Sequence, residues 1–98
     1  MQDSATTVAS AVQQEAEDAV SLATAQPREA RARALAARER ARELGDRAAE
    51  STAERALGLA ARELGDLDGA LAHLQAAISV AERAGAQTEA GRARMSLS

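Results

Sequence analysis

Residues 51–85 read STAERALGLAARELGDLDGALAHLQAAISVAERAG, and this stretch decides the fold of the chain. Its apolar residues recur at spacings of three and four in two runs, one on each side of the dipeptide Gly65-Asp66. Each run leaves Glu, Arg and Gln on the opposite side, the pattern of a helix covered on one face. Glycine ends a helix without steric cost in the left-handed conformation, and aspartate caps the helix that follows. The stretch therefore predicts two antiparallel helices joined by a tight turn.

The same helix-and-turn pattern recurs along the chain. The hexamer ARELGD stands at residues 41–46 and again at 61–66, and a related AERAG follows after the same interval. The glycines that would end helices are evenly spaced by 20, at Gly45, Gly65 and Gly85. A helix pair therefore takes 40 residues. We predict an all-α chain of antiparallel hairpins, with five helices at about 3–25, 27–44, 47–64, 67–84 and 88–98.

The apolar runs also give the expected core. In the central pair it comprises Ala53, Ala56, Leu57, Ala60, Leu64, Ala70, Leu71, Leu74, Ala77, Ile78 and Ala81. In the first pair it comprises Val8, Val12, Ala16, Ala19, Val20, Ala23, Ala30, Ala34, Ala37 and Ala41, with Leu35 and Leu44 adding bulk. Burial contributes roughly 25 cal/mol per Å² of apolar area, and alanine buries little. We expect a folded but modest core.

Seven residues of the central pair carry a resemblance to a known family. They are Leu57, Gly58, Gly65, Asp66, Ala70, Leu74 and Ala77. With them the pair resembles the tetratricopeptide repeat, a helix–turn–helix unit that stacks into an α-solenoid. The family's Trp, Tyr and Phe are replaced here by Glu54, Ala61 and Leu74. The resemblance implies a scaffold that binds a protein or peptide.

The period of the repeat is longer than the family standard of about 34 residues. It is similar to the long repeats of bacterial arrays, including those that precede CHAT-type protease domains. One domain over residues 1–98 would contain repeat 1 at about 4–45, repeat 2 at about 47–85 and a partial repeat at 88–98. Solenoids need about three repeats and polar end caps. We therefore expect a piece of a longer protein, or a homodimer formed through exposed terminal helices.

Composition excludes several classes of function. The net charge is −3, aromatic residues make up 0% of the chain, and the sequence pI is about 5.1. Nucleic-acid binding is not expected without basic charge or stacking aromatics. No apolar run approaches the roughly 20 residues of a membrane helix, so no membrane partner is expected. The absence of cysteine fits the reducing cytoplasm, and the exclusive use of arginine among 12 basic residues indicates a bacterial source.

No residue set indicates catalysis, a metal site or a cofactor, and we predict that the chain is not an enzyme. His73 is the single histidine and has no Cys or second His beside it, so we expect a surface or half-buried structural residue. The remaining candidates are carboxylates, which we interpret as solvated helix faces. They are Glu15, Glu17, Asp18, Glu50, Glu54 and Glu63.

A groove is the remaining candidate site. The first helix of each pair lines the concave face in the family that the chain resembles. This predicts a groove formed by Thr52, Arg55, Leu59, Arg62, Arg92 and Met95. Its three arginines would make one end cationic, which suits an acidic peptide or a C-terminal carboxylate. The alternative is that the arginines only keep the chain soluble.

A different interpretation of the same stretch is one continuous helix. Leu57, Leu64, Leu71 and Ile78 are spaced by seven residues, which is the repeat of a coiled coil. A glycine inside a helix costs only about 1 kcal/mol. The chain would then be a structural, self-associating oligomer without a groove ligand. The repeated Gly-Asp break favours the hairpin, and the two interpretations differ in whether the chain turns back at Gly65.

Overall fold

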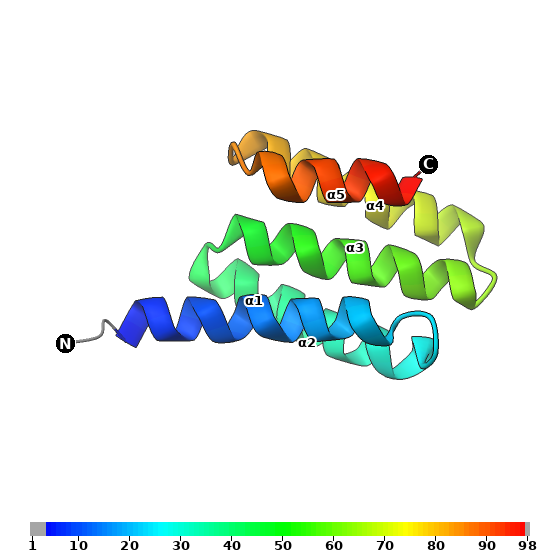
Figure 1. Cartoon of the computed structure of the whole chain (residues 1–98), viewed down its shortest axis with the longest axis horizontal. Helices are drawn as coiled ribbons and strands as arrows, with labels where there is room; N and C mark the ends of the chain where they lie inside the picture. The colour runs from blue at the N-terminus through cyan, green and yellow to red at the C-terminus, as the bar shows by residue number, and fades with distance from the viewer. Residues whose placement is uncertain (1–3, 98) are drawn as a thin grey trace.

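The computed structural model describes residues 4–97, and these form five α-helices without any strand. The helices are α1 (Ser4–Leu22), α2 (Pro27–Leu44), α3 (Arg47–Glu63), α4 (Leu67–Arg83) and α5 (Gln87–Leu97). Successive helices run antiparallel and stack as hairpins (Figure 1). The prediction of an all-α, repeat-like stack of five helices is confirmed. From α2 onward, the expected helix ends agree with the structure to within one residue.

The end of α1 was predicted wrongly, since the helix stops at Leu22 rather than at residue 25. The backbone N–H of Gln26 donates to the carbonyl of Leu22 across 2.8 Å and closes a turn. Proline disfavours the helical conformation in the residue before it, and Gln26 accordingly has φ −137° and ψ 67°. Asp3, which the sequence offers with Ser4 as a cap of this helix because both side chains can accept the first free N–H groups, lies outside the described residues.

The three predicted turn glycines all adopt the left-handed backbone conformation. Their φ angles are 68° at Gly45, 83° at Gly65 and 72° at Gly85. The carboxylate of Asp46 accepts the N–H of Ala49 at 3.1 Å, and that of Asp66 accepts the N–H of Gly69 at 2.9 Å. These bonds cap α3 and α4. The chain turns back after α3, so the continuous coiled coil is wrong.

The core between α1, α2 and α3 consists of four layers, and each layer takes one small residue from α1 or the turn after it, one from α2 and one from α3. From one end to the other they are Val12 with Ala41 and Ala49, Ala16 with Ala37 and Ala53, Ala19 with Ala34 and Ala56, and Ala23 with Ala30 and Ala60. Every one of these residues is at most 1% exposed. Short side chains let the three backbones approach closely, and Leu57 is the one large residue that the layers contain, beside Ala19 and Ala34.

α4 repeats the burial pattern of α2 forty positions later, with Ala70, Leu74, Ala77 and Ala81 buried. Leu74 is the one large residue among them. Gly58 provides its space, because a Cβ atom there would lie 2.7 Å from the Cγ of Leu74 and 3.1 Å from the carbonyl oxygen of Ala70. Gly58 thus lets α4 approach α3 closely.

Several large apolar residues that we expected in the core lie at the surface. Their exposed fractions are 38% for Val8, 39% for Leu35, 49% for Leu44, 38% for Leu64 and 48% for Leu71. The prediction of burial is wrong for these five. The three-helix layers are already filled, mainly by alanine, and these five residues lie on faces outside them.

α3 is the central helix of the stack. It contacts α1, α2, α4 and α5, whereas within residues 4–97 α2 and α4 make no contact with each other. α1, α3 and α5 form one layer, and α2 and α4 form the other (Figure 1). The stack measures 46 × 26 × 18 Å. No helix of the described chain is long and apolar enough to cross a membrane.

Candidate functional site

The predicted groove residues lie on two helices of the α1–α3–α5 layer. Thr52, Arg55, Leu59 and Arg62 belong to α3, and Arg92 and Met95 belong to α5. Arg62 and Met95 are exposed, the latter at 78%. The Nη1 of Arg62 donates to the carbonyl of Ser96 across 3.3 Å and joins α3 to α5. The structure thus brings the α3 and α5 parts of the predicted groove together.

Two of the predicted groove residues offer little free surface. Thr52 is 5% exposed. Its Oγ1 accepts the Nε2 of Gln13 at 3.2 Å and donates to the carbonyl of Ala48 at 3.1 Å. Leu59 is partly buried against the layer that contains Ala60. These two residues hold α3 in place, and the accessible part of the predicted groove is therefore mainly its arginines and Met95.

Charges from all three helices of this layer meet around Arg55. Burial lowers the pKa of Arg55 below its ordinary value, and the positive charge of Arg92 lowers it further. The carboxylate of Glu17 on α1 acts in the opposite direction. An arginine stays protonated despite such a shift. Two guanidinium groups therefore face mutual repulsion on this surface, only partly offset by one carboxylate.

A buried polar cluster on α3 was missed by the sequence analysis. Glu54 is 5% exposed, so its assignment to a solvated face is wrong. Its Oε1 accepts the Nη1 of Arg38 on α2 at 2.9 Å and lies 3.2 Å from the Nδ1 of His73 on α4. One carboxylate thus connects the two helices that do not contact each other. The half-buried position of His73 was predicted correctly, but its acidic partner was not.

Glu50 is the second buried carboxylate, at 4% exposure, and its assignment to a solvated face is likewise wrong. Burial alone would raise its pKa. Hydrogen bonds and charges from Arg47, whose Nη1 lies 2.7 Å away, and Arg42, whose Nε lies 3.1 Å away, outweigh that effect and lower the pKa. Nearby, the Oγ of buried Ser51 donates to the carbonyl of Ala77 across 2.7 Å.

The sequence contained a signal for this burial. Glu54 stands three residues before buried Leu57, and Glu50 stands four residues before Glu54. Residues at these spacings share one face of a helix. A face that carries Leu57 inward carries both carboxylates inward as well. The prediction that both side chains are exposed followed from their charge and not from their positions in the helix.

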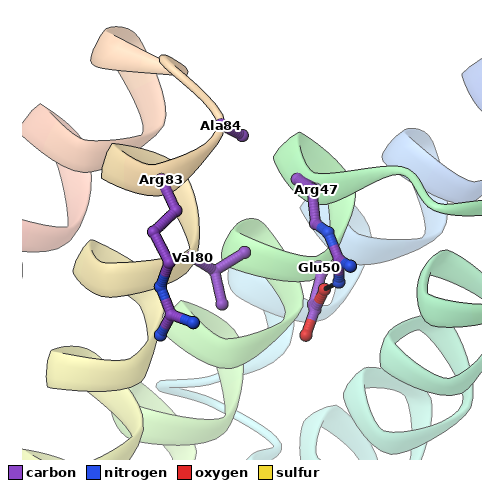
Figure 2. Close-up of a pocket in the computed structure, with 5 residues that line it drawn as sticks. All are labelled: Arg47, Glu50, Val80, Arg83 and Ala84. Atoms are coloured by element: carbon purple, nitrogen blue, oxygen red, sulfur yellow. Dashed lines mark hydrogen bonds and ion pairs between the residues drawn. The ribbon is translucent and has the colours of Figure 1, made fainter.

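A cleft of about 400 Å³ opens between the first turn of α3 and the last turn of α4 (Figure 2). It is lined by Arg47, Glu50, Val80, Arg83 and Ala84, and we call it the α3–α4 cleft. Arg83 has no hydrogen-bond or ion-pair partner among the described residues. The cleft includes none of the predicted groove residues.

Within residues 4–97, no group of three or more His, Cys, Asp or Glu side chains is placed to hold a metal ion. The arginines of the α1–α3–α5 layer and those of the α3–α4 cleft are the charged groups considered further as candidate sites. Comparison with family models, with curated proteins and with solved structures finds no match for this chain. The resemblance to the tetratricopeptide repeat accordingly rests on the repeat residues themselves.

Proposed function

We propose that the chain is a non-enzymatic interaction module of the tetratricopeptide type, which binds a protein or peptide on its α1–α3–α5 layer. The stack of antiparallel hairpins with a 40-residue period supports this proposal. A layer of first helices presents side chains from several repeats on one surface, and such surfaces suit extended ligands. The absence of cysteine supports a place in the reducing cytoplasm of a bacterium.

The position of Arg55 is the observation that carries the proposal. Its guanidinium is half-buried and lies within the field of Arg92. Bringing like charges together in a partly dry place costs free energy, and a bound anion would offset that cost. Arg62 lies in the same helix and extends the positive surface toward α5. We therefore infer that the ligand is acidic, either a run of Asp and Glu or a C-terminal carboxylate.

Met95 supplies an apolar contact next to these charges. It lies on α5 and is 78% exposed, three residues beyond Arg92. Methionine is flexible and polarizable, so it adapts to different apolar partners. An acidic peptide with a neighbouring aliphatic side chain fits this combination best.

Calorimetric titration with a panel of acidic peptides tests the proposal. Each peptide is compared with its amidated form and with a form in which Glu is replaced by Gln. We expect the acidic forms to bind, and Arg55→Gln or Arg92→Gln to weaken binding about tenfold each, which corresponds to about 1.4 kcal/mol. Arg31→Gln is the control, since Arg31 is exposed on α2. Equal weakening by Arg31→Gln, or equal binding of the Gln peptides, would contradict the proposal.

Self-association through α5 is the second candidate function. Leu57 of α3 is 3% exposed, whereas Leu97, forty residues later on α5, is 38% exposed. A Cβ added at Gly91 would meet nothing within 4 Å. The face of α5 that corresponds to the covered face of α3 is thus open, and a second copy would cover it. Sedimentation equilibrium should then give a dimer that Leu97→Glu dissociates, and a monomer at high concentration would rule this out.

A further inference from the structure

The α3–α4 cleft is a second charged site, distinct from the proposed peptide surface. Its walls are the first turn of α3, with Arg47 and Glu50, and the end of α4, with Val80 and Arg83 (Figure 2). Its volume of about 400 Å³ lies in the range of sites for small ligands. A ligand there would contact charged groups on both walls and apolar groups from α4.

The negative charge inside the cleft is already neutralised by the protein. The side chain of Glu50 is 6% exposed and forms ion pairs with both Arg42 and Arg47. Those two pairs hold the carboxylate in its charged form, because they outweigh the effect of burial on its pKa. The cleft is lined by two arginines and one glutamate, and Arg42 pairs with that glutamate without lining the cleft, so an excess of positive charge remains.

The neighbouring acidic residues do not remove this excess. Asp46 precedes Arg47, but its carboxylate caps α3 through the N–H of Ala49. Glu82 precedes Arg83, but it forms an ion pair with Arg94 on α5. Arg83 itself has no partner among the described residues. Arg83 is thus the charged group of the cleft that is available to bind an anion.

Arg83 also lies in the last turn of α4, where a positive charge interacts favourably with the helix dipole. That interaction requires a cation, and lysine would supply it equally well. It does not require the planar, forked guanidinium, nor an arginine such as Arg47 on the facing wall. An anion held by two hydrogen bonds from one arginine does require that fork. The two roles of Arg83 can therefore be separated by experiment.

We propose that the α3–α4 cleft binds an oxyanion, phosphate or carboxylate, between the guanidinium groups of Arg47 and Arg83. Val80 and Ala84 would contact the apolar part of the molecule that carries the anion. The phosphate could be inorganic or part of a phosphorylated metabolite, and the carboxylate could belong to a small organic acid. The shared requirement is a compact group with two or more acceptor oxygens.

NMR titration of the ¹⁵N-labelled chain tests this proposal. Inorganic phosphate and succinate are added in separate series, each with sodium chloride adjusted to constant ionic strength. We expect saturable amide shifts at residues 47–50 and 80–84, and the tighter of the two probes identifies the class of oxyanion. Shifts that grow linearly without saturation, or that lie outside these residues, would overturn the proposal.

Four variants separate the site from general charge effects. Arg83→Gln should weaken binding at least tenfold, and Arg83→Lys should weaken it while keeping the thermal midpoint of the wild type. Arg31→Gln, on the exposed side of α2, and Arg55→Gln, on the other layer, should bind as the wild type does. Equal affinity of Arg83→Gln and wild type would overturn the proposal. Because Arg55→Gln tests only the peptide surface, failure of one site is distinguishable from failure of the other.

Discussion

Two regions around α3 are held by different chemistry. In the apolar region, four layers of small residues, with Leu57 in one of them, pack against α1 and α2. On the polar side, Glu54 and Glu50 form ion pairs with α2, while Glu54 and Ser51 contact α4. Alanine layers allow the helices to approach closely, but because the layers resemble one another they do not favour one position of the helices over another. We therefore expect the polar contacts, which have fixed partners and directions, to specify how the second hairpin lies on the first.

The largest effect is expected when the polar side loses its central carboxylate. Glu54→Ala leaves Arg38 without its ion pair, and the Nε of Arg38 is already buried without a partner. Leaving a fully buried charge unpaired costs about 3–5 kcal/mol, and because the side chain of Arg38 is 21% exposed we expect a loss of about 2–3 kcal/mol of unfolding free energy. Urea denaturation followed by circular dichroism measures the loss. Glu63→Ala, at an exposed position of the same helix, should change stability by no more than about 0.5 kcal/mol.

The next largest effect concerns Leu74, which is the one leucine among the buried alanines of α4. Gly58→Ala puts a Cβ atom 2.7 Å from the Cγ of Leu74, and we expect a loss of about 1–2 kcal/mol despite the better helix propensity of alanine. Gly91→Ala is the matched control, since its Cβ meets nothing within 4 Å, and it should stabilise the chain slightly. The double variant Gly58→Ala, Leu74→Ala should remove the clash with the leucine side chain and leave only the contact of 3.1 Å with the carbonyl oxygen of Ala70. Thermal unfolding of all three that showed no difference would contradict the close approach of α3 and α4.

A smaller effect is expected from the single hydroxyl on the polar side. Ser51→Ala removes the 2.7 Å bond to the carbonyl of Ala77, and the net cost of such a bond is about 1 kcal/mol. Ser79→Ala, at an exposed position of α4, serves as the control and should be neutral. If both variants unfolded at the same urea concentration, the hydroxyl would contribute nothing to the position of α4.

The smallest effect appears as pH dependence. The pKa of Glu50 is lowered in the folded chain, so its ion pairs stabilise the fold fully above the ordinary pKa of 4.5. That stabilisation is lost as the pH falls through the folded value. Glu50→Gln should therefore flatten the decline of stability below about pH 4.5. Urea midpoints measured between neutral and acidic pH, for this variant and the wild type, would show parallel curves if Glu50 were not involved.

The comparison also explains which features could be predicted from sequence. Turns are local, so Gly45 and Gly65 with their following aspartates were sufficient to place α2, α3 and α4. Burial is not local. Leu35 and Leu71 look like core residues in a helical pattern, but the faces they occupy are not covered by a neighbouring helix, and both are exposed. Which face is covered depends on how three helices meet.

The candidate sites show the same division. The sequence was sufficient to predict that Arg55, Arg62 and Arg92 belong to first helices of the repeat. The hydrogen bond between Thr52 and Gln13 could not be predicted, because it depends on how closely α1 approaches α3. The burial of Glu54 depends on Arg38 and His73, which stand 16 and 19 residues away in the chain. The α3–α4 cleft likewise joins residues from two helix ends. Features that depend on such distant pairs were missed or only partly predicted.

The gap between α2 and α4 has a mechanical consequence. The backbones of these two helices do not come close to each other, and Glu54 joins them through its contacts with Arg38 and His73. A layer of helices that is joined by polar contacts should bend more readily than a layer of helices packed directly on one another. The curvature of the stack, and with it the width of the surface formed by the α1–α3–α5 layer, would then respond to ionic strength.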